Sequence, residues 1–238
     1  MNVFYCPTIT GNEALLSPEE STHCIRVLRL AKGDKVQLID GKGGMFEARI
    51  SVPDAKQCRL ELQGTIIHQK NRDFSLHIAI APTKSMQRFE WFVEKAVEIG
   101  IDTITPLLCQ RSERRVLKTD RLHKLILSTM KQAVIPCLPV LNQLTDLRSF
   151  LAAFNESPGC CFIAHCAETE RKTLKNAVIP GSDVTVLIGP EGDFSPDEIG
   201  LAANNGFIPV TLGPNRLRTE TAGIVVCSTA FLCNEVMG

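Results

Sequence analysis

Two arginines and a glutamate are packed into the stretch L-G-P-N-R-L-R-T-E-T-A-G, at residues 212–223. Thr219 fits the N-cap of a helix, and Glu220 in its first turn would suit the helix dipole. Helix geometry gives no reason for Arg216 and Arg218, because a cation beside a helix N-terminus is mildly unfavourable. The pattern therefore predicts that something anionic or polar meets these arginines.

A second glycine-rich stretch, V-L-I-G-P-E-G-D-F-S-P-D-E at residues 186–198, leads from an apolar strand into a helix start. Each of the Gly-Pro pairs at 189–190 and 213–214 follows a strand-like run, and ligands of α/β proteins bind at the carboxyl ends of strands. One such pair is typical of a tight turn, whereas two at adjacent strand ends favour a ligand site. Neither loop matches G-x-G-x-x-G or G-x-x-x-x-G-K-[ST], which disfavours a dinucleotide site and a P-loop.

The ten cysteines and five histidines show no metal-ligand spacing. There is no C-x-x-C, and most cysteines lie among aliphatic residues, as buried reduced thiols do. We therefore expect neither disulfides nor a bound metal. No apolar run approaches the roughly 20 residues of a membrane span. The N-terminus lacks the form of a signal peptide, so we expect a cytoplasmic protein that does not bind membranes.

The elements that must position these loops fall into two parts. The first part, residues 1–70, has a helix start at Ser17-Pro18-Glu19-Glu20 and three runs of alternating hydrophobicity. These patterns predict a helix over residues 17–30 and strands over residues 35–40, 45–52 and 58–67. Several short strands in so few residues indicate a small β-barrel.

From residue 74 onward, apolar strand-like runs alternate with amphipathic segments. We predict strands over residues 75–81, 103–108, 160–165, 184–189 and 207–212, and helices over residues 87–99 and 120–134. This alternation indicates a mostly parallel sheet covered on both faces, an α/β fold. The polar residues 70–73 mark the boundary between the two parts.

Taken together, G-P-E-G-x-F-S-x-x-E and L-G-x-x-x-L-R-T-E-T-A are similar to the C-terminal signature of the ribosomal RNA small subunit methyltransferase E family of the SPOUT superfamily. The blocks at residues 23–34, 92–106 and 111–112 also resemble this family, so the resemblance covers the whole chain. It implies a PUA-like β-barrel RNA-binding domain over residues 1–70. It further implies a SPOUT α/β methyltransferase domain over residues 74–238, with a deep C-terminal trefoil knot.

The activity implied by the resemblance is transfer of a methyl group from S-adenosylmethionine to N3 of a uridine in 16S rRNA of the small ribosomal subunit, by a homodimer. The residues that would bind the cofactor, mainly through their backbone, are Ala164, His165, Gly189, Pro190, Glu191, Gly192, Leu212, Gly213, Leu217, Arg218, Thr219 and Ala222. We expect Arg218, with Arg216 as a possible helper, to stabilise the uracil anion. Glu220, Glu191 or a water route would remove the N3 proton.

Basic residues gather between Arg111 and Lys131, where seven of them face two acidic ones in a chain of zero net charge. A solvated helix face and a phosphate-binding patch both fit this composition. The RNA contacts that we expect are Arg26, Arg29, Arg111, Arg114, Arg115, Lys118 and Gln132. Arg26 and Arg29 are expected to share one helix face.

The sequence departs from the family pattern at two places. Asp193 stands where the family commonly has a second glycine after G-P-E-G. Residues 131–135 read K-Q-A-V-I where the family commonly has E-Q-S-G-R, so only Gln132 matches and an expected arginine is missing. This second departure puts an RNA contact from that position in doubt but leaves the cofactor loops untouched.

Two other functions fit the same residues. One is a knotted methyltransferase that modifies a ribose 2′-hydroxyl or a tRNA. The other is a non-catalytic RNA-binding assembly factor that keeps the fold. A dehydrogenase is disfavoured because the dinucleotide fingerprint is absent.

Overall fold

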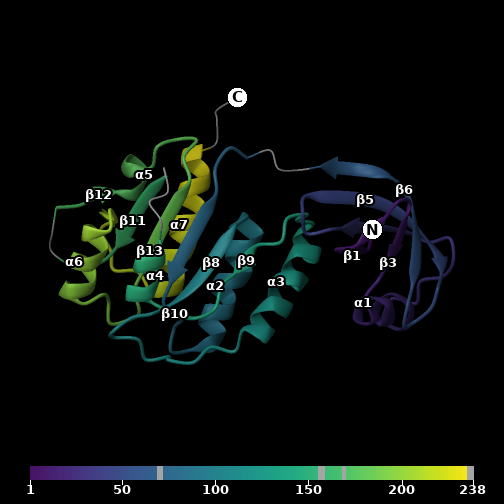
Figure 1. Ribbon diagram of the computed structural model, residues 1–238, viewed down its shortest axis with the longest axis horizontal. Coiled ribbons are helices and arrows are strands. Elements are labelled where there is room, and N and C mark those ends of the chain that lie inside the picture. Colours follow the sequence, from purple (N-terminus) through teal and green to yellow (C-terminus); the bar gives the residue numbers. More distant parts are fainter. Residues whose placement is uncertain (69–71, 155–158, 168–169, 235–238) are drawn as a thin grey trace. The chain divides into compact units, whose positions relative to one another are not determined.

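The computed structural model describes residues 1–68, 72–154, 159–167 and 170–234 (Figure 1). Its contacts divide the chain into two compact units. One unit comprises Met1–Asn71 and Ile126–Leu138, and the other comprises Arg72–Leu125 and Pro139–Gly238. A boundary close to residue 70 was predicted from the sequence, whereas the grouping of residues 126–138 with the first unit was not.

The first unit is built on a curled six-stranded sheet in the order β1-β4-β5-β6-β3-β2. Its strands are β1 (Val3–Tyr5), β2 (Ile9–Thr10), β3 (Glu13–Leu15), β4 (Lys35–Ile39), β5 (Gly44–Val52) and β6 (Arg59–His68). β4, β5 and β6 coincide closely with the three predicted strands and pair antiparallel. Alternate residues such as Phe4, Leu38, Ile50 and Leu60 point inward and form the core of the unit.

The predicted helix of the first unit begins as expected, since the Ser17 side chain accepts a hydrogen bond from the Glu20 N–H (3.2 Å). It ends earlier than predicted: α1 (Pro18–Thr22) passes into the π-helix η1 (His23–Val27). The Leu28 N–H bonds the His23 carbonyl five residues back (2.9 Å), which widens the last turn. Arg29 then adopts a left-handed conformation (φ 56°) that cannot continue the helix. The expectation that Arg26 and Arg29 share a helix face was therefore wrong.

The second unit is an α/β fold with an eight-stranded parallel sheet in the order β10-β8-β7-β13-β11-β14-β12, with β9 beside β8. Its strands are β7 (Leu76–Ile80), β8 (Thr103–Leu108), β9 (Val140–Leu141), β10 (Thr145–Asp146), β11 (Cys160–Ala164), β12 (Lys172–Thr173), β13 (Val184–Ile188) and β14 (Ile208–Thr211). The five long strands are those predicted from the sequence. The short edge strands β9, β10 and β12 were not predicted.

Helices cover both faces of this parallel sheet. They are α2 (Met86–Ile99), α4 (Leu147–Ala153), α5 (Leu174–Ala177), α6 (Pro196–Asn204) and α7 (Thr219–Asn234). The remaining helix, α3 (Thr119–Ala133), begins in this unit and ends among residues grouped with the first unit. On one face, Phe150 of α4 and Ala202 of α6 belong to a core that contains Leu187 of β13. On the other face, α7 packs on β7 and β13 and against α2. The predicted cover on both faces is therefore present.

Three further features bear on function. Within the described ranges, no helix combines the length and apolar character needed to cross a membrane. The same residues contain no group of three or more His, Cys, Asp or Glu side chains placed to hold a metal ion. None of the ten cysteines, all of which lie in the described ranges, is in a disulfide.

Candidate functional site

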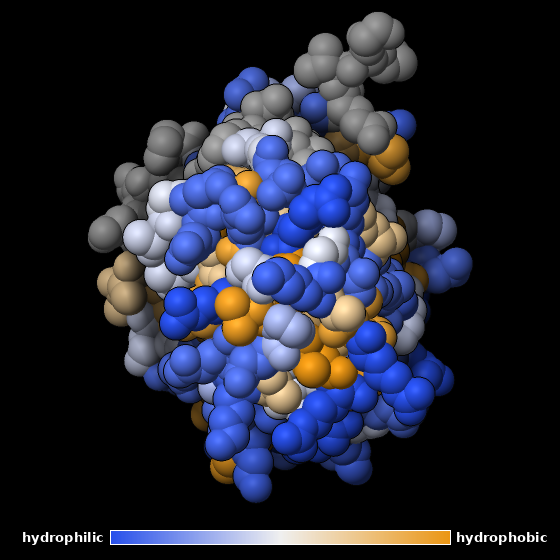
Figure 2. Space-filling model, turned by 90° about the vertical axis from the view of Figure 1, so that its right-hand side faces the viewer, coloured by the Kyte–Doolittle hydropathy of each residue, from blue (hydrophilic) through white to orange (hydrophobic). Residues whose placement is uncertain are grey.

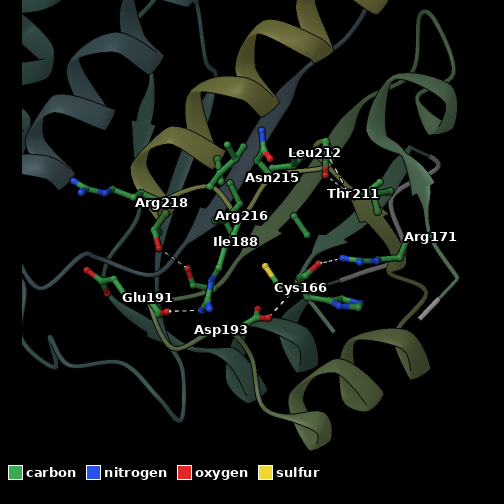
Figure 3. Close-up of a pocket in the computed structure, with 18 of the residues that line it drawn as sticks. Cys166, Arg171, Ile188, Glu191, Asp193, Thr211, Leu212, Asn215, Arg216 and Arg218 are labelled. Carbon is green, nitrogen blue, oxygen red and sulfur yellow. Dashed lines mark hydrogen bonds between the residues drawn. The ribbon is translucent and has the colours of Figure 1, made fainter. Parts of the chain in front are cut away.

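A cavity of about 480 Å³ opens at the carboxyl ends of β11, β13 and β14, which are adjacent in the sheet order β13-β11-β14 (Figure 3). The register Ala164↔Ile188 and Ala164↔Val210 places these three strand ends at the same level. Because parallel strands end at one edge, the loops that follow them converge. The cavity volume lies within the roughly 300–1,000 Å³ typical of small-molecule sites.

The loop after β13 approaches the cavity through its backbone. A Cβ added at Gly189 would lie 3.1 Å from the ring of the buried Phe194, so a side chain would crowd this turn. The buried Thr219 hydroxyl donates a hydrogen bond to the Gly189 carbonyl (3.1 Å). The start of α7 is thus tied to the end of β13, and two predicted loops become walls of one cavity.

The loop after β14 is held by Thr211. Its hydroxyl donates to the Gly213 carbonyl (2.9 Å) and accepts from the Gly213 N–H (3.3 Å). Gly213 has φ 141°, in the region that favours glycine. The residues that follow this turn, Pro214, Asn215, Arg216 and Leu217, line the cavity.

The turn after β11 contains a buried histidine with an unused hydrogen-bond donor. His165 is only 5% exposed, and its Nδ1 accepts from the Ala167 N–H (3.2 Å), so the proton sits on Nε2. Burial, and then the neighbouring Arg171, lower the pKa of His165, while Asp193 opposes this shift. Nε2 is buried without a partner among the described residues. A ligand that offers an acceptor would satisfy it.

The charged side chains of the cavity differ in what they already bind. Arg216 donates to the Glu191 carbonyl (3.2 Å), and the Glu191 carboxylate accepts from the Lys84 N–H (2.9 Å). The exposed Arg218 guanidinium has no hydrogen bond or ion pair within the part of the chain that the structure describes. Figure 3 shows Arg218 and Glu191 toward one end of the cavity and Arg171 toward the other.

Glu220 lies apart from the cavity-lining residues. Its carboxylate is 9% exposed and faces Arg88 of α2, with Oε1 3.7 Å from Nε. Its Oε2 is buried without a partner among the described residues. Arg88 was not singled out in the sequence, because nothing in the spacing of α2 relates it to Glu220.

All the residues predicted to bind the cofactor line the cavity, except Gly192. The cavity also contains residues that were not predicted to bind it: Cys166, Arg171, Ile188, Asp193, Val210, Thr211, Pro214, Asn215 and Arg216. Most of these flank predicted positions on the same loops, so extending each motif by a few residues would have found them. Arg171 alone follows no motif in the sequence.

Two of the arginines predicted to contact RNA donate hydrogen bonds to backbone carbonyls of the chain. Arg111 donates to the Gly192 carbonyl (2.9 Å), and Arg114 donates to the carbonyls of Thr83 (3.0 Å) and Lys84 (2.5 Å). The basic segment is therefore partly structural. The remaining predicted RNA contacts, Arg26, Arg29, Arg115, Lys118 and Gln132, are exposed.

One face of the molecule, shown in Figure 2, is mostly hydrophilic with a smaller group of apolar side chains among the polar ones. In the described part of the first unit, large exposed apolar side chains include Leu15, Val27 and Val52. The face is thus of mixed character, and its appearance does not locate an RNA-binding surface.

Comparison with known proteins gives a consistent result for both parts of the chain. The model of an RNA methyltransferase PUA domain matches residues 16–63, and that of an RNA methyltransferase domain matches residues 70–230. Two relatives named ribosomal RNA small subunit methyltransferase E, from Rickettsia conorii and Aquifex aeolicus, are each 26% identical to this chain. The alignments cover 93% and 96% of this chain and 92% and 98% of the relatives.

Two solved structures extend the comparison. A probable rRNA-methyltransferase from Porphyromonas gingivalis is 39% identical, with a TM-score of 0.90. A putative methyltransferase from Legionella pneumophila, in complex with the bound cofactor SAM, is 30% identical, with a TM-score of 0.86. Each alignment covers 98% of both chains.

A curled PUA-type sheet joined to a parallel α/β unit, with a ligand-sized cavity at the strand ends, is the architecture of an RNA methyltransferase. The agreement over the whole length narrows this class further. The chain belongs to the ribosomal RNA small subunit methyltransferase E family.

Proposed function

We propose that this protein binds S-adenosylmethionine in the cavity at the ends of β11, β13 and β14 and methylates N3 of a uridine in 16S rRNA of the small ribosomal subunit. The observation that carries this proposal is the convergence of three strand-end loops on one cavity in a member of this family. A cytoplasmic location follows from a ribosomal substrate.

The residues present fit this ligand. The cavity has the size of a small-molecule site, and the glycine turns at Gly189 and Gly213 bring backbone groups to its wall. The buried Nε2–H of His165 has no acceptor among the described residues, and both the adenosine and the amino-acid group of the ligand carry hydrogen-bond acceptors. Bound S-adenosylmethionine supplies an activated methyl group, so the protein must align, deprotonate and stabilise the uridine.

Arg218 is the residue that we assign to the uracil anion. Its guanidinium is exposed and unpaired among the described residues, and Arg218 is one of the residues that line the cavity. Loss of the N3 proton places negative charge on O2 and O4, and a guanidinium placed beside these oxygens lowers the energy of that anion. Arg218 forms no salt bridge to Glu220 or Glu191 among the described residues, so no such pairing ties it to a purely structural role.

Glu191 is the better placed of the two candidate bases. Glu191 lines the cavity, and its carboxylate is oriented by the Lys84 N–H. Glu220 is buried beside Arg88 and outside the cavity wall, so we assign it to holding the first turns of α2 and α7 together. Direct removal of the N3 proton by Glu191 or through one water remains compatible with this geometry.

We include two further family features in the proposal. One is a deep trefoil knot formed by the loops around the cavity, supported by membership of this family. The other is a homodimer. Ile224 and Val225 of α7 are half-buried, and Leu232 on the same helix face is 67% exposed. A second copy would cover this apolar face.

The test compares Arg218→Ala with Arg148→Ala, an exposed arginine of α4 outside the cavity. Arg218→Ala should leave S-adenosylmethionine affinity within a few-fold of wild type and abolish methyl transfer, while Arg148→Ala changes neither. If Arg218→Ala loses cofactor binding and methyl transfer equally, Arg218 binds the cofactor and does not stabilise the uracil anion.

The product identifies the substrate. Mass spectrometry of the product nucleoside must show N3-methyluridine from 16S rRNA. A 2′-O-methyl product or a modified tRNA would contradict the proposed substrate, and absence of cofactor binding would favour an assembly factor.

RNA binding is tested separately at the exposed basic residues. Arg115→Glu with Lys118→Glu should weaken RNA binding and flatten its dependence on salt, because each phosphate contact releases counterions. Arg148→Glu serves as the control for added negative charge. Unchanged RNA affinity would show that Arg115 and Lys118 do not contact the RNA.

A further inference from the structure

Two side chains of opposite charge, Asp193 and Arg171, bind the backbone of the same dipeptide, His165-Cys166, at the end of β11. The Cys166 N–H donates to Asp193 Oδ2 (2.8 Å), and Arg171 Nη1 donates to the His165 carbonyl. His165, Cys166, Asp193 and Arg171 all line the cavity. A carboxylate and a guanidinium therefore stand on either side of one backbone turn, as Figure 3 shows around Cys166.

Asp193 is rigidly placed for a residue in its conformation. Its φ of 63° lies in the left-handed region, which aspartate and asparagine tolerate better than most residues. Oδ1 accepts from the Phe194 N–H (2.9 Å), so both carboxylate oxygens are held. A carboxylate offers about four lone-pair sites, and these two bonds leave the others free for a ligand.

Arg171 also keeps most of its binding capacity. A guanidinium has five N–H donors in a planar fork, and one of them binds the His165 carbonyl. Within the described residues, Arg171 and Asp193 form no ion pair with each other. The two charges are neighbours in the cavity wall that do not neutralise one another.

An α-amino acid carries the complementary pair of charges, an ammonium and a carboxylate on one carbon. Charge-assisted hydrogen bonds of this kind are stronger than neutral ones, and a guanidinium fork matches a carboxylate. A phosphate would be repelled by Asp193, and an uncharged nucleoside would leave both charges unused. Arg218 and Glu191 lie toward the other end of the cavity, where the uridine is proposed to bind.

We propose that Asp193 and Arg171 form a zwitterion site that holds the ammonium and the carboxylate of the ligand's amino-acid group. This inference rests on the proposed function, since it assigns one end of the same cavity. It gives a role to Asp193, which stands where the family commonly has glycine, and to Arg171, which no motif indicated. It also orients the ligand, because the amino-acid group at this end leaves the opposite end to the RNA base.

The test measures calorimetric affinity of the full chain for two ligands. S-adenosylhomocysteine carries the amino-acid group, and 5′-methylthioadenosine keeps the adenosyl thioether without it. Asp193→Asn and Arg171→Met should each lower the affinity for S-adenosylhomocysteine roughly tenfold or more, which is the effect of losing one charge-assisted hydrogen bond. Both variants should change methylthioadenosine affinity less than twofold. Asp197→Asn and Lys172→Met, which alter exposed charges outside the cavity, should change neither affinity.

The outcomes separate this inference from the proposed function. Equal losses for both ligands, or no loss for either, would overturn the zwitterion site. If the wild type binds both ligands equally well, the zwitterion site is also wrong while the adenosyl cavity stands. If it binds neither, the proposed function fails. Asp193→Gly controls for a change in backbone conformation, since glycine adopts the left-handed φ without strain while the carboxylate is removed. It should show the same ligand-selective loss with an unchanged thermal midpoint.

Discussion

A buried glycine sets how closely α7 approaches α2, and its replacement by alanine gives a prediction whose size follows from the structure. A Cβ added at Gly223 would lie 2.4 Å from Cε2 of Phe92, about 1 Å short of the ordinary contact range that begins at 3.4 Å. Phe92 is fully buried, so its ring has little room to move. Alanine gains about 1 kcal/mol over glycine in a helix, whereas overpacking a core costs about 1–3 kcal/mol and more when backbone must shift. We expect Gly223→Ala to lower the free energy of unfolding by about 1–2 kcal/mol.

Gly200 of α6 provides the matched control. It is also helical, but it is exposed, and an added Cβ would meet nothing within 4 Å. Gly200→Ala should therefore raise the free energy of unfolding by about 0.5–1 kcal/mol. Urea unfolding of both variants measures the difference, which should be opposite in sign. If Gly223→Ala stabilises the protein as Gly200→Ala does, the close packing of α2 on α7 is wrong.

Three other changes test separate features. Burial lowers the pKa of His77 to about 4, so the folded state resists protonation and stability falls as pH drops from about 6.5 toward 4. By pH 5 the loss due to His77 should be about 2 kcal/mol in urea titrations, and His77→Gln should reduce the pH dependence by that amount while His165, whose pKa is also lowered, still contributes; an unaltered slope would contradict the assignment. Val134 is a β-branched residue at φ 56°, so Val134→Gly should raise stability by about 1 kcal/mol, and a lower thermal midpoint would argue against strain there. Thr219→Val removes the bond to Gly189 and should lower stability by about 1–3 kcal/mol and weaken S-adenosylhomocysteine binding, whereas unchanged binding would separate that bond from the cavity.

The sequence predicted the long elements well because their signals are local. β13 is a run of five buried residues, and α2 ends where Gly100 takes φ 106°, so both could be recognised from composition and a stop residue. The end of η1 could not be predicted from the sequence, because the wide turn at Leu28 depends on hydrogen-bond spacing rather than on residue type. Strands of two residues such as β12 carry too few residues for a periodic pattern, and they exist only through pairing with β14.

The candidate site was predictable where glycines and a family motif marked it. The loops around Gly189 and Gly213 were expected to meet, and the cavity joins them. The partners of the arginines were not predictable, since Arg114 binds carbonyls about 30 residues away and Arg111 binds one 81 residues away. Likewise, Asp193 was noted only as a departure from a pattern. Its hydrogen bond to the Cys166 N–H depends on the adjacency of β11 and β13.

The most direct test of the central claim is a crystal structure of this protein with S-adenosylhomocysteine bound. We expect the adenosyl group between the Gly189–Glu191 turn and the Leu212–Leu217 loop, with its amino-acid group at Asp193 and Arg171 and its sulfur facing the end where Arg218 lies. Ligand density elsewhere on the chain, or none at saturating concentration, would contradict the account.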